Sequence, residues 1–159
     1  MSPADEGAVA PLRVVVAGPD DEGLRPALEA EARRLGVTDR LVFVGAVADA
    51  EKHALLTHAR ALVLPSYSEN FGNVVLEAMA AGCPVIVTPE VGAAPIVAAA
   101  GAGWVVSGEP STLGSRISSL AANSELRAGM SARAREAARD YTWDSVAGQM
   151  ESVYGGLLR

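Results

Sequence analysis

The chain alternates between short apolar runs and longer segments in which apolar residues recur at helical spacing. Five runs are short and almost continuously apolar: 13–17, 41–44, 61–64, 85–87 and 103–106. Such runs, bounded by Gly, Pro and polar residues, are typical of strands. The runs 61–64 and 85–87 look fully buried, as strands are in a parallel sheet whose two faces are covered by helices. The pattern therefore predicts an α/β protein with a Rossmann-like, three-layer parallel sheet.

The segments between and after these runs are predicted to be helices. They span about 24–35, 49–59, 73–81, 91–100, 111–121 and 124–139. Thr142 is expected to cap a last helix in which one stripe is apolar. The stripe consists of Trp143, Val146, Ala147, Met150, Val153, Tyr154 and Leu157. We expect this stripe to be core, with the alternative that part of it is left exposed in this chain. We expect the arginines of the 124–139 segment to lie mostly on solvated faces.

The segment 62–88 contains the residues best suited to bind a ligand. It predicts a strand, a polar loop of sequence SYSENFG, a helix from Asn73, and a second strand. In a βαβ unit that loop lies at the carboxyl end of a parallel strand, where open α/β sheets bind ligands. Gly72 would let the backbone approach a ligand closely, and Asn73 is a good N-cap. The helix end behind them is suited to a phosphate.

Two carboxylates flank this loop. Glu69 lies within it, and Glu77 lies one turn into the following helix. A carboxylate accepts hydrogen bonds from vicinal hydroxyls, as the acidic residue of a Rossmann-type site does from a ribose. The residues alone leave two interpretations open: a site for a nucleotide and a second polyol, or two solvated acidic side chains.

Length and composition limit the alternatives. The 159 residues predict one domain over 12–159, preceded by a flexible leader at 1–11. A net charge of −6 argues against nucleic acid or an anionic membrane as the main partner. A single cysteine fits a reducing compartment, and no apolar run is long enough to span a bilayer, so we expect a cytoplasmic protein without a transmembrane segment.

The 62–88 segment resembles the signature of the retaining GT-B glycosyltransferases of family 4. The matching residues are Pro65-Ser66, Glu69-Asn70-Phe71-Gly72, Glu77-Ala78-Met79-Ala80, Gly82-Cys83-Pro84-Val85-Ile86 and Thr88. The resemblance extends from about Leu12 to the C-terminus. It corresponds to the C-terminal, nucleotide-sugar-binding half of a GT-B fold.

The resemblance implies a role for each site residue. Glu69 would be the catalytic-site carboxylate that contacts the donor sugar, and Glu77 would hold the ribose. The sugar and phosphates would contact Asn70, Phe71, Gly72, Asn73 and Val74. The base would lie against the loop that includes Gly45 and Val47. Gly18 either approaches the diphosphate or forms a plain turn. The donor would be a nucleotide-diphosphate sugar, and neither a metal nor a further cofactor is expected.

Departures from the family pattern also matter. Ile96 stands where the family usually has a glutamate, and Lys52, the only lysine, is not where the family's basic pair lies. The N-terminal acceptor domain and the opening strand of the donor domain have no counterpart in these 159 residues. We therefore expect the isolated domain to be inactive, and the full enzyme to associate with a membrane at most peripherally. Two alternatives stay open: a non-catalytic nucleotide-sugar-binding or interaction module on the same fold, and a GT-B-fold sugar-nucleotide epimerase.

Overall fold

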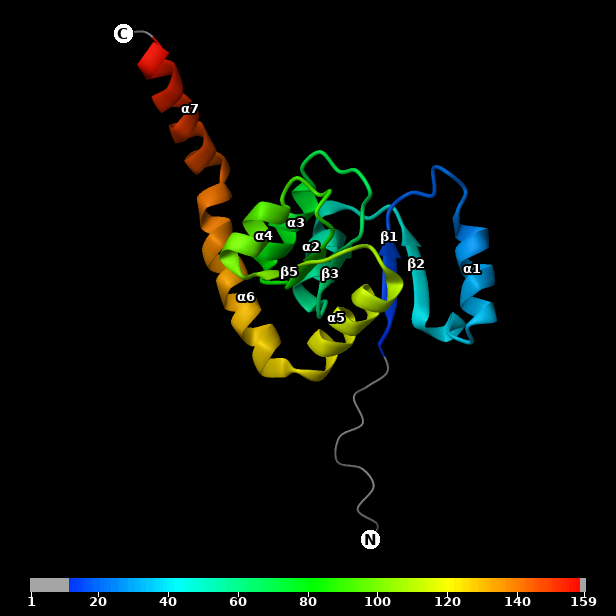
Figure 1. Cartoon of the computed structure of the whole chain (residues 1–159). Helices are drawn as coiled ribbons and strands as arrows, with labels where there is room; N and C mark the ends of the chain where they lie inside the picture. The colour runs from blue at the N-terminus through cyan, green and yellow to red at the C-terminus, as the bar shows by residue number, and fades with distance from the viewer. Residues whose placement is uncertain (1–11, 158–159) are drawn as a thin grey trace. The chain divides into compact units, whose positions relative to one another are not determined.

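The computed structural model describes residues 12–157, which divide into two compact units with a boundary between Lys52 and His53. Figure 1 labels their helices and strands. The units are described separately below. The leader expected at 1–11 lies outside the described residues, and the single domain over 12–159 stays a prediction.

The first unit is a βαβ unit. It contains β1 (Val14–Ala17), α1 (Arg25–Arg34), a 3₁₀ turn (Thr38–Arg40), β2 (Leu41–Gly45) and the first residues of α2 (Asp49–His58). The strands β1 and β2 are parallel, as predicted, with Val14 opposite Leu41. The Asp20 carboxylate accepts hydrogen bonds from the backbone N–H groups of Leu24 and Arg25, so it satisfies free donors at the start of α1.

The side chains of β1 and β2 are more exposed than those of a parallel sheet with helices on both faces. Val14 and Val15 of β1 are 51% and 44% exposed, and Val42 and Val44 of β2 are also exposed. Ala32 of α1 is the one apolar side chain in residues 12–52 that is buried. The parallel pair agrees with the predicted α/β class, although its apolar side chains are more exposed than those of β4 in the second unit.

The second unit holds a three-stranded parallel sheet. Its strands are β3 (Leu62–Leu64), β4 (Val85–Val87) and β5 (Gly103–Val105), in the order β3-β4-β5. Its helices beyond α2 are α3 (Asn73–Ala81), α4 (Ala94–Ala100), α5 (Pro110–Ala122), α6 (Ser124–Ala138) and α7 (Trp143–Leu157), with a 3₁₀ turn at Arg139–Tyr141. The α/β class with parallel strands is thus confirmed.

The central strand β4 explains the layering of this unit. All three of its side chains are fully buried. Val85 and Val87 pack in one cluster with residues of α3 and α4, whereas Ile86 packs in a second cluster with Leu120 of α5 and Met130 of α6. Because successive side chains of a strand point to opposite faces, helices cover both faces of the sheet. The strand β3, at the edge of this sheet, is only half-buried rather than fully buried as expected.

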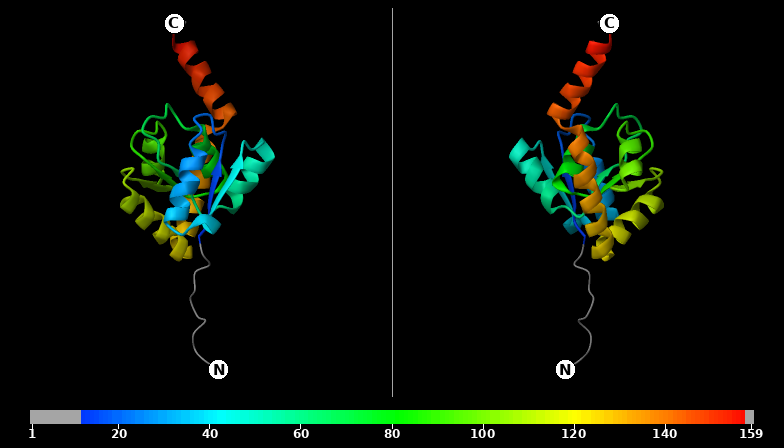
Figure 2. Two further views of the ribbon diagram at one scale, coloured as in Figure 1. Left: turned by 90° about the vertical axis from the view of Figure 1, so that its right-hand side faces the viewer. Right: turned by 90° about the vertical axis from the view of Figure 1, so that its left-hand side faces the viewer.

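The helix α6 runs alongside α3, as Figure 2 shows. Its polar side chains bond carbonyl oxygens at the C-terminal ends of other helices. Ser131 Oγ donates to Gly82 O at 2.6 Å, and Arg133 Nε donates to Gly101 O at 2.8 Å. Arg127 Nη1 donates to Ala121 O at 2.9 Å, and Arg135 Nη2 donates to Ala81 O at 3.3 Å.

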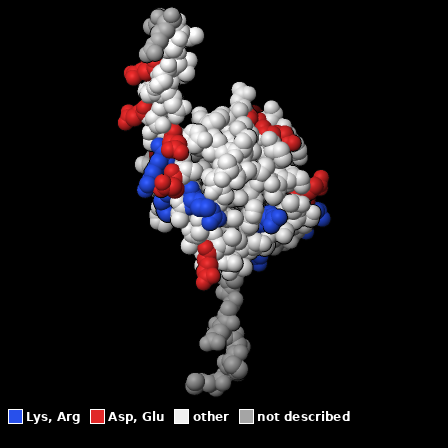
Figure 3. Space-filling model, turned by 60° about the vertical axis from the view of Figure 1, so that its left-hand side comes forward, with Lys and Arg blue, Asp and Glu red and all other residues white. Residues whose placement is uncertain are grey.

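The expectation that these arginines lie mostly on solvated faces is confirmed, because Arg133, Arg135 and Arg139 are exposed and only Arg127 is partly buried. Their hydrogen bonds to carbonyl oxygens were not predicted. Arg127, Arg133 and Arg135 reach the C-termini of α5, α4 and α3, where carbonyl groups lack partners within their own helix. A cation at such an end is also favoured by the helix dipole. Figure 3 shows basic and acidic side chains gathered along the surface of α6 and the start of α7.

The expectation that the stripe of α7 is core is wrong for the described chain. No residue of α7 is buried, and Trp143 and Leu157 are 89% and 77% exposed. In Figure 1, α7 continues beyond α6 and extends away from the sheet of β3, β4 and β5. The Thr142 cap is confirmed, because Thr142 Oγ1 accepts a hydrogen bond from the Ser145 N–H. None of the helices in residues 12–157 is both long and apolar enough to cross a bilayer.

Candidate functional site

Two loops of the second unit are bonded to each other at the carboxyl ends of neighbouring strands. The first, residues 65–72, follows β3, and the second, residues 88–93, follows β4. The backbone of Glu69 accepts from Gly92 N at 3.0 Å and donates to Glu90 O at 3.2 Å, which pairs Glu69 with Val91 as an isolated parallel bridge. Ala93 N donates to Phe71 O at 2.9 Å. The predicted site loop is therefore held along its length.

Thr88 anchors the start of the same loop. It is 2% exposed, and its hydroxyl donates to the backbone carbonyl of Ser66. Thr88 directly follows β4, so this hydrogen bond ties the loop after one strand to the end of its neighbour. The sequence contained Thr88 within the signature, but nothing in the sequence alone indicated which group it contacts.

Gly92 permits the close approach of the two loops. A Cβ atom at this position would lie 2.0 Å from Asn70 O and 2.9 Å from Phe71 Cα. Both contacts are with backbone, which cannot swing away as a long side chain could. Only glycine therefore fits at this position without separating the loops.

Gly72 sets the direction of the chain into α3. Its φ of 79° lies in the left-handed region, which a side chain disfavours. An added Cβ would also meet Val91 Cγ1 at 3.1 Å and Glu69 Cγ at 3.3 Å. The prediction that Asn73 is the N-cap is wrong: Gly72 holds the cap position, Asn73 is the first helical residue, and no side chain caps the helix. The first N–H groups of α3 therefore have no side-chain acceptor at the cap.

Neither of the two predicted carboxylates is fully solvated. Glu69 and Glu77 are both partly buried, and Glu77 Oε2 is removed from solvent altogether. This contradicts the interpretation of Glu77 as an ordinary exposed helix residue. Asn70 and Phe71 are exposed, and Val74 is partly buried against the core. The structure thus brings Glu69, Gly72 and the start of α3 together on one loop.

The other predicted site residues lie in the first unit. Gly18 follows β1 and Gly45 is the last residue of β2, and Gly18 N donates to Gly45 O at 2.8 Å. Both have positive φ, 142° and 70°, with open space where a Cβ would stand. Val47 is partly buried. The two glycines are therefore neighbours at one end of the β1–β2 pair, and they are part of this unit's own turn structure.

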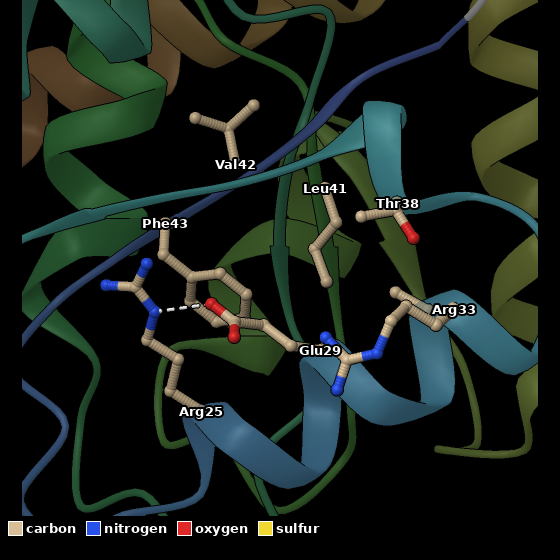
Figure 4. A pocket seen from close by; sticks show the side chains of 8 residues that line it. Arg25, Glu29, Arg33, Thr38, Leu41, Val42 and Phe43 are labelled. Carbon is tan, nitrogen blue, oxygen red and sulfur yellow. Dashed lines mark hydrogen bonds and ion pairs between the residues drawn. The ribbon is translucent and has the colours of Figure 1, made fainter.

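A shallow hollow also lies between α1 and β2 in the first unit (Figure 4). Its walls include Arg25, Glu29, Arg33, Leu41 and Phe43. Arg25 Nε bonds Glu29 Oε1 at 2.7 Å, and its guanidinium lies 5.0 Å from the centre of the Phe43 ring. These contacts pair Arg25 with Glu29 and Phe43, and no residue predicted for the site lines the hollow.

Residues 12–157 contain no group of three or more His, Cys, Asp or Glu side chains that could hold a metal ion. Cys83 is buried, and burial raises the pKa of its thiol to about 11. A thiol with so high a pKa stays protonated at neutral pH and is a poor nucleophile. A nucleophilic role for Cys83 is therefore not supported.

Comparison with known proteins gives the same assignment along most of the chain. The family model "Glycosyl transferases group 1" matches residues 6–137. The D-inositol 3-phosphate glycosyltransferase of Streptomyces scabiei is 37% identical over 148 residues, which is 91% of this chain and 33% of that protein. The chain thus spans about a third of the length of the curated relatives that it matches.

Solved structures agree on the fold. Sucrose-phosphate synthase from Thermosynechococcus elongatus aligns with a TM-score of 0.80 and 27% identity, over 92% of this chain and 38% of that one. The complex of Anabaena HepE with UDP and glucose aligns with a TM-score of 0.78 and 24% identity, over 91% and 40% of the two chains. The family model covers most of the sequence and the fold matches the C-terminal half of GT-B enzymes, so this chain belongs to the group 1 glycosyl transferases.

Proposed function

We propose that the chain is the donor-binding domain of a glycosyltransferase that transfers a sugar from a nucleotide-diphosphate sugar with retention of configuration. One observation carries the proposal: the Glu69–Gly72 loop is fixed by a second loop and leads through a left-handed glycine into a helix that no side chain caps. A fixed loop before an uncapped helix start is suited to a phosphorylated ligand.

Each candidate residue has a role in this proposal. The N–H groups at the start of α3 and the backbone from Asn70 to Val74 contact the sugar and the phosphates, and the partial positive charge of the helix end meets the leaving diphosphate. Glu77 accepts hydrogen bonds from the ribose hydroxyls. Glu69 contacts the donor sugar near its reacting face, and we do not assign it as a covalent nucleophile.

Gly18, Gly45 and Val47 of the first unit are the remaining residues proposed to contact the donor. No heavy atom lies within 4 Å of the place of a Cβ at Gly18 or Gly45, so the backbone is open to a ligand there. Gly18 would approach the diphosphate, and the base would lie against Gly45 and Val47. The single cysteine is buried and takes part in no step, in keeping with an enzyme of the reducing cytoplasm.

The isolated chain should bind a donor but transfer no sugar. Transfer requires an acceptor held ~3–3.5 Å from the anomeric carbon, and such positioning supplies a large part of an enzyme's rate. In the full-length protein we assign most of that task to a second domain. A non-catalytic sugar-nucleotide-binding module would also bind without turnover, so turnover must be tested in the full-length protein.

The first test is a binding experiment on the purified chain. UDP-glucose is the first probe, because the structure of Anabaena HepE, which shares this fold, contains it. GDP- and ADP-sugars complete the panel in a thermal-shift assay, followed by calorimetry. Glu77→Ala should weaken binding of the preferred donor by ~1–3 kcal/mol, since two hydroxyl donors lose their acceptor.

The matched control is Glu151→Ala, which removes an exposed carboxylate of α7 far along the chain from the loop. This variant should bind the donor as the wild type does. Equal donor affinity in the wild type and in Glu77→Ala would contradict the proposed role of Glu77. Absence of binding to every sugar nucleotide would contradict the proposed function.

A further inference from the structure

One aromatic side chain stands out from the fixed loop. Tyr67 is 91% exposed. Its neighbours are nevertheless fixed: Ser66 O accepts the hydrogen bond from the Thr88 hydroxyl, and Glu69 is hydrogen-bonded through both its N–H and its C=O. Tyr67 is the most exposed large apolar side chain of residues 12–157. The backbone of this loop is thus held in place while it presents a bare ring to solvent.

The position of Tyr67 separates it from the phosphate end of the site. The loop runs from Tyr67 through Glu69 to Gly72 and the start of α3, so Tyr67 and the helix end lie on opposite sides of Glu69 along the chain. Two residues span at most ~7 Å. A sugar that contacts Glu69 is therefore within reach of the Tyr67 ring, whereas the diphosphate lies at the other end of the loop.

The charges of the two loops restrict what can bind there. Residues 65–73 and 88–94 contain two carboxylates, Glu69 and Glu90, and no lysine, arginine or histidine. An anionic group placed beside Tyr67 would meet like charge without a compensating cation. Hydroxyl groups, by contrast, can donate to these carboxylates and to the Asn70 amide oxygen.

We propose that Tyr67 is a specificity-determining contact for the acceptor, and that the part of the acceptor lying against it is an uncharged sugar ring or other polyol. The apolar C–H face of the ring packs on the face of the phenol, and its hydroxyls donate to the loop carboxylates. The inference rests on the proposed function, because it takes the reacting sugar of the donor to lie at Glu69.

The test uses the purified chain with saturating UDP and a panel of methyl glycosides. Uncharged glycosides are compared with the same sugars carrying a phosphate or a carboxylate, and binding is followed by saturation-transfer and chemical-shift NMR. The uncharged glycosides should perturb the Tyr67 ring and the amides of Ser68 and Glu69. They should bind more tightly than their charged counterparts at low ionic strength.

Three variants identify the origin of the signal. Tyr67→Ala should weaken glycoside binding about 2- to 12-fold, which is the range that one aromatic contact supplies. Tyr67→Phe keeps the ring and should bind as the wild type does. Tyr141→Ala removes an exposed tyrosine outside the loop and should have no effect.

The outcomes separate this inference from the proposed function. Equal binding in Tyr67→Ala and wild type, preference for the charged glycosides, or no binding of any uncharged glycoside would overturn the inference. The nucleotide affinity of Tyr67→Ala should equal that of the wild type. If nucleotide binding itself is absent, the proposed function fails first, and it fails independently of Tyr67.

Discussion

Substitution of Gly92 by alanine tests how strongly the second loop fixes the first. The added Cβ would lie 2.0 Å from Asn70 O, whereas carbon and oxygen atoms that are not bonded stay at least ~3.3 Å apart. The two loops must therefore separate by more than ~1 Å. The backbone φ of Gly92 is not in the left-handed region, so the effect is one of space and not of backbone strain.

The magnitude follows from the hydrogen bonds that separation would lengthen. Gly92 N–Glu69 O and Ala93 N–Phe71 O are 3.0 and 2.9 Å long, and both would exceed hydrogen-bonding distance. Each backbone hydrogen bond contributes ~0.5–1.5 kcal/mol to stability. The loss is partly offset by ~0.4–1 kcal/mol, because alanine restricts the unfolded chain. We expect the free energy of unfolding to fall by ~1–2 kcal/mol.

Urea unfolding followed by circular dichroism measures this change, and amide chemical shifts locate it. The matched control is Gly114→Ala in α5, where no heavy atom lies within 4 Å of the added Cβ. That variant should be stabilised by ~0.5–1 kcal/mol, because glycine is unfavourable inside a helix. Gly92→Ala should also bind the donor more weakly, since Glu69 moves. Unchanged stability together with unchanged amide shifts at residues 69–71 would refute the argument.

Three further predictions concern the second unit. Met79→Ala, in the fully buried face of α3, should lower the free energy of unfolding in urea by ~2–5 kcal/mol. Met150→Ala, on exposed α7, should change it by no more than ~0.5 kcal/mol, and equal changes would contradict the described burial. Arg133→Ala should cost ~1 kcal/mol and increase amide exchange near Gly101, and unchanged exchange would show that the bond to Gly101 O is not formed in solution. The Cys83 thiol has a raised pKa of about 11, so the unfolded chain loses this proton first, and stability should fall as pH rises from about 9 to 11. Cys83→Ala should remove that part of the pH dependence, and the same slope in both proteins would contradict it.

The sequence predicted the features that depend on local pattern. The apolar run of β4 is buried on both faces, as continuous apolar strands are. The turn glycine at 72 and the helix that follows it were also evident, because the SYSENFG loop is polar and the next residues recur at helical spacing. The loop and the helix after it could thus be located from sequence. The N-cap was misassigned, because Gly72 takes the cap position and Asn73 is already helical.

Features that depend on contacts between distant residues could not be predicted in this way. The bond from Thr88 to Ser66 spans 22 residues, and that from Arg133 to Gly101 spans 32. No periodicity indicates which carbonyl a polar side chain will reach. The apolar stripe of α7 was misjudged for a related reason. An apolar face at helical spacing indicates a helix that packs against another surface, but it does not indicate that this surface belongs to the described chain.

The way in which α6 is attached has a consequence for behaviour in acid. Arg127, Arg133 and Arg135 bond backbone carbonyls, and neither a guanidinium nor a carbonyl changes its protonation between pH 2 and neutrality. Ion pairs on the surface, such as that of Arg139 with Glu136, are lost when the carboxylate is protonated. Acidification should therefore break the ion pairs on the exposed face of α6, whereas its hydrogen bonds to the ends of the three helices should remain. The part of the unit that survives longest at low pH should be the one that these three arginines tie together.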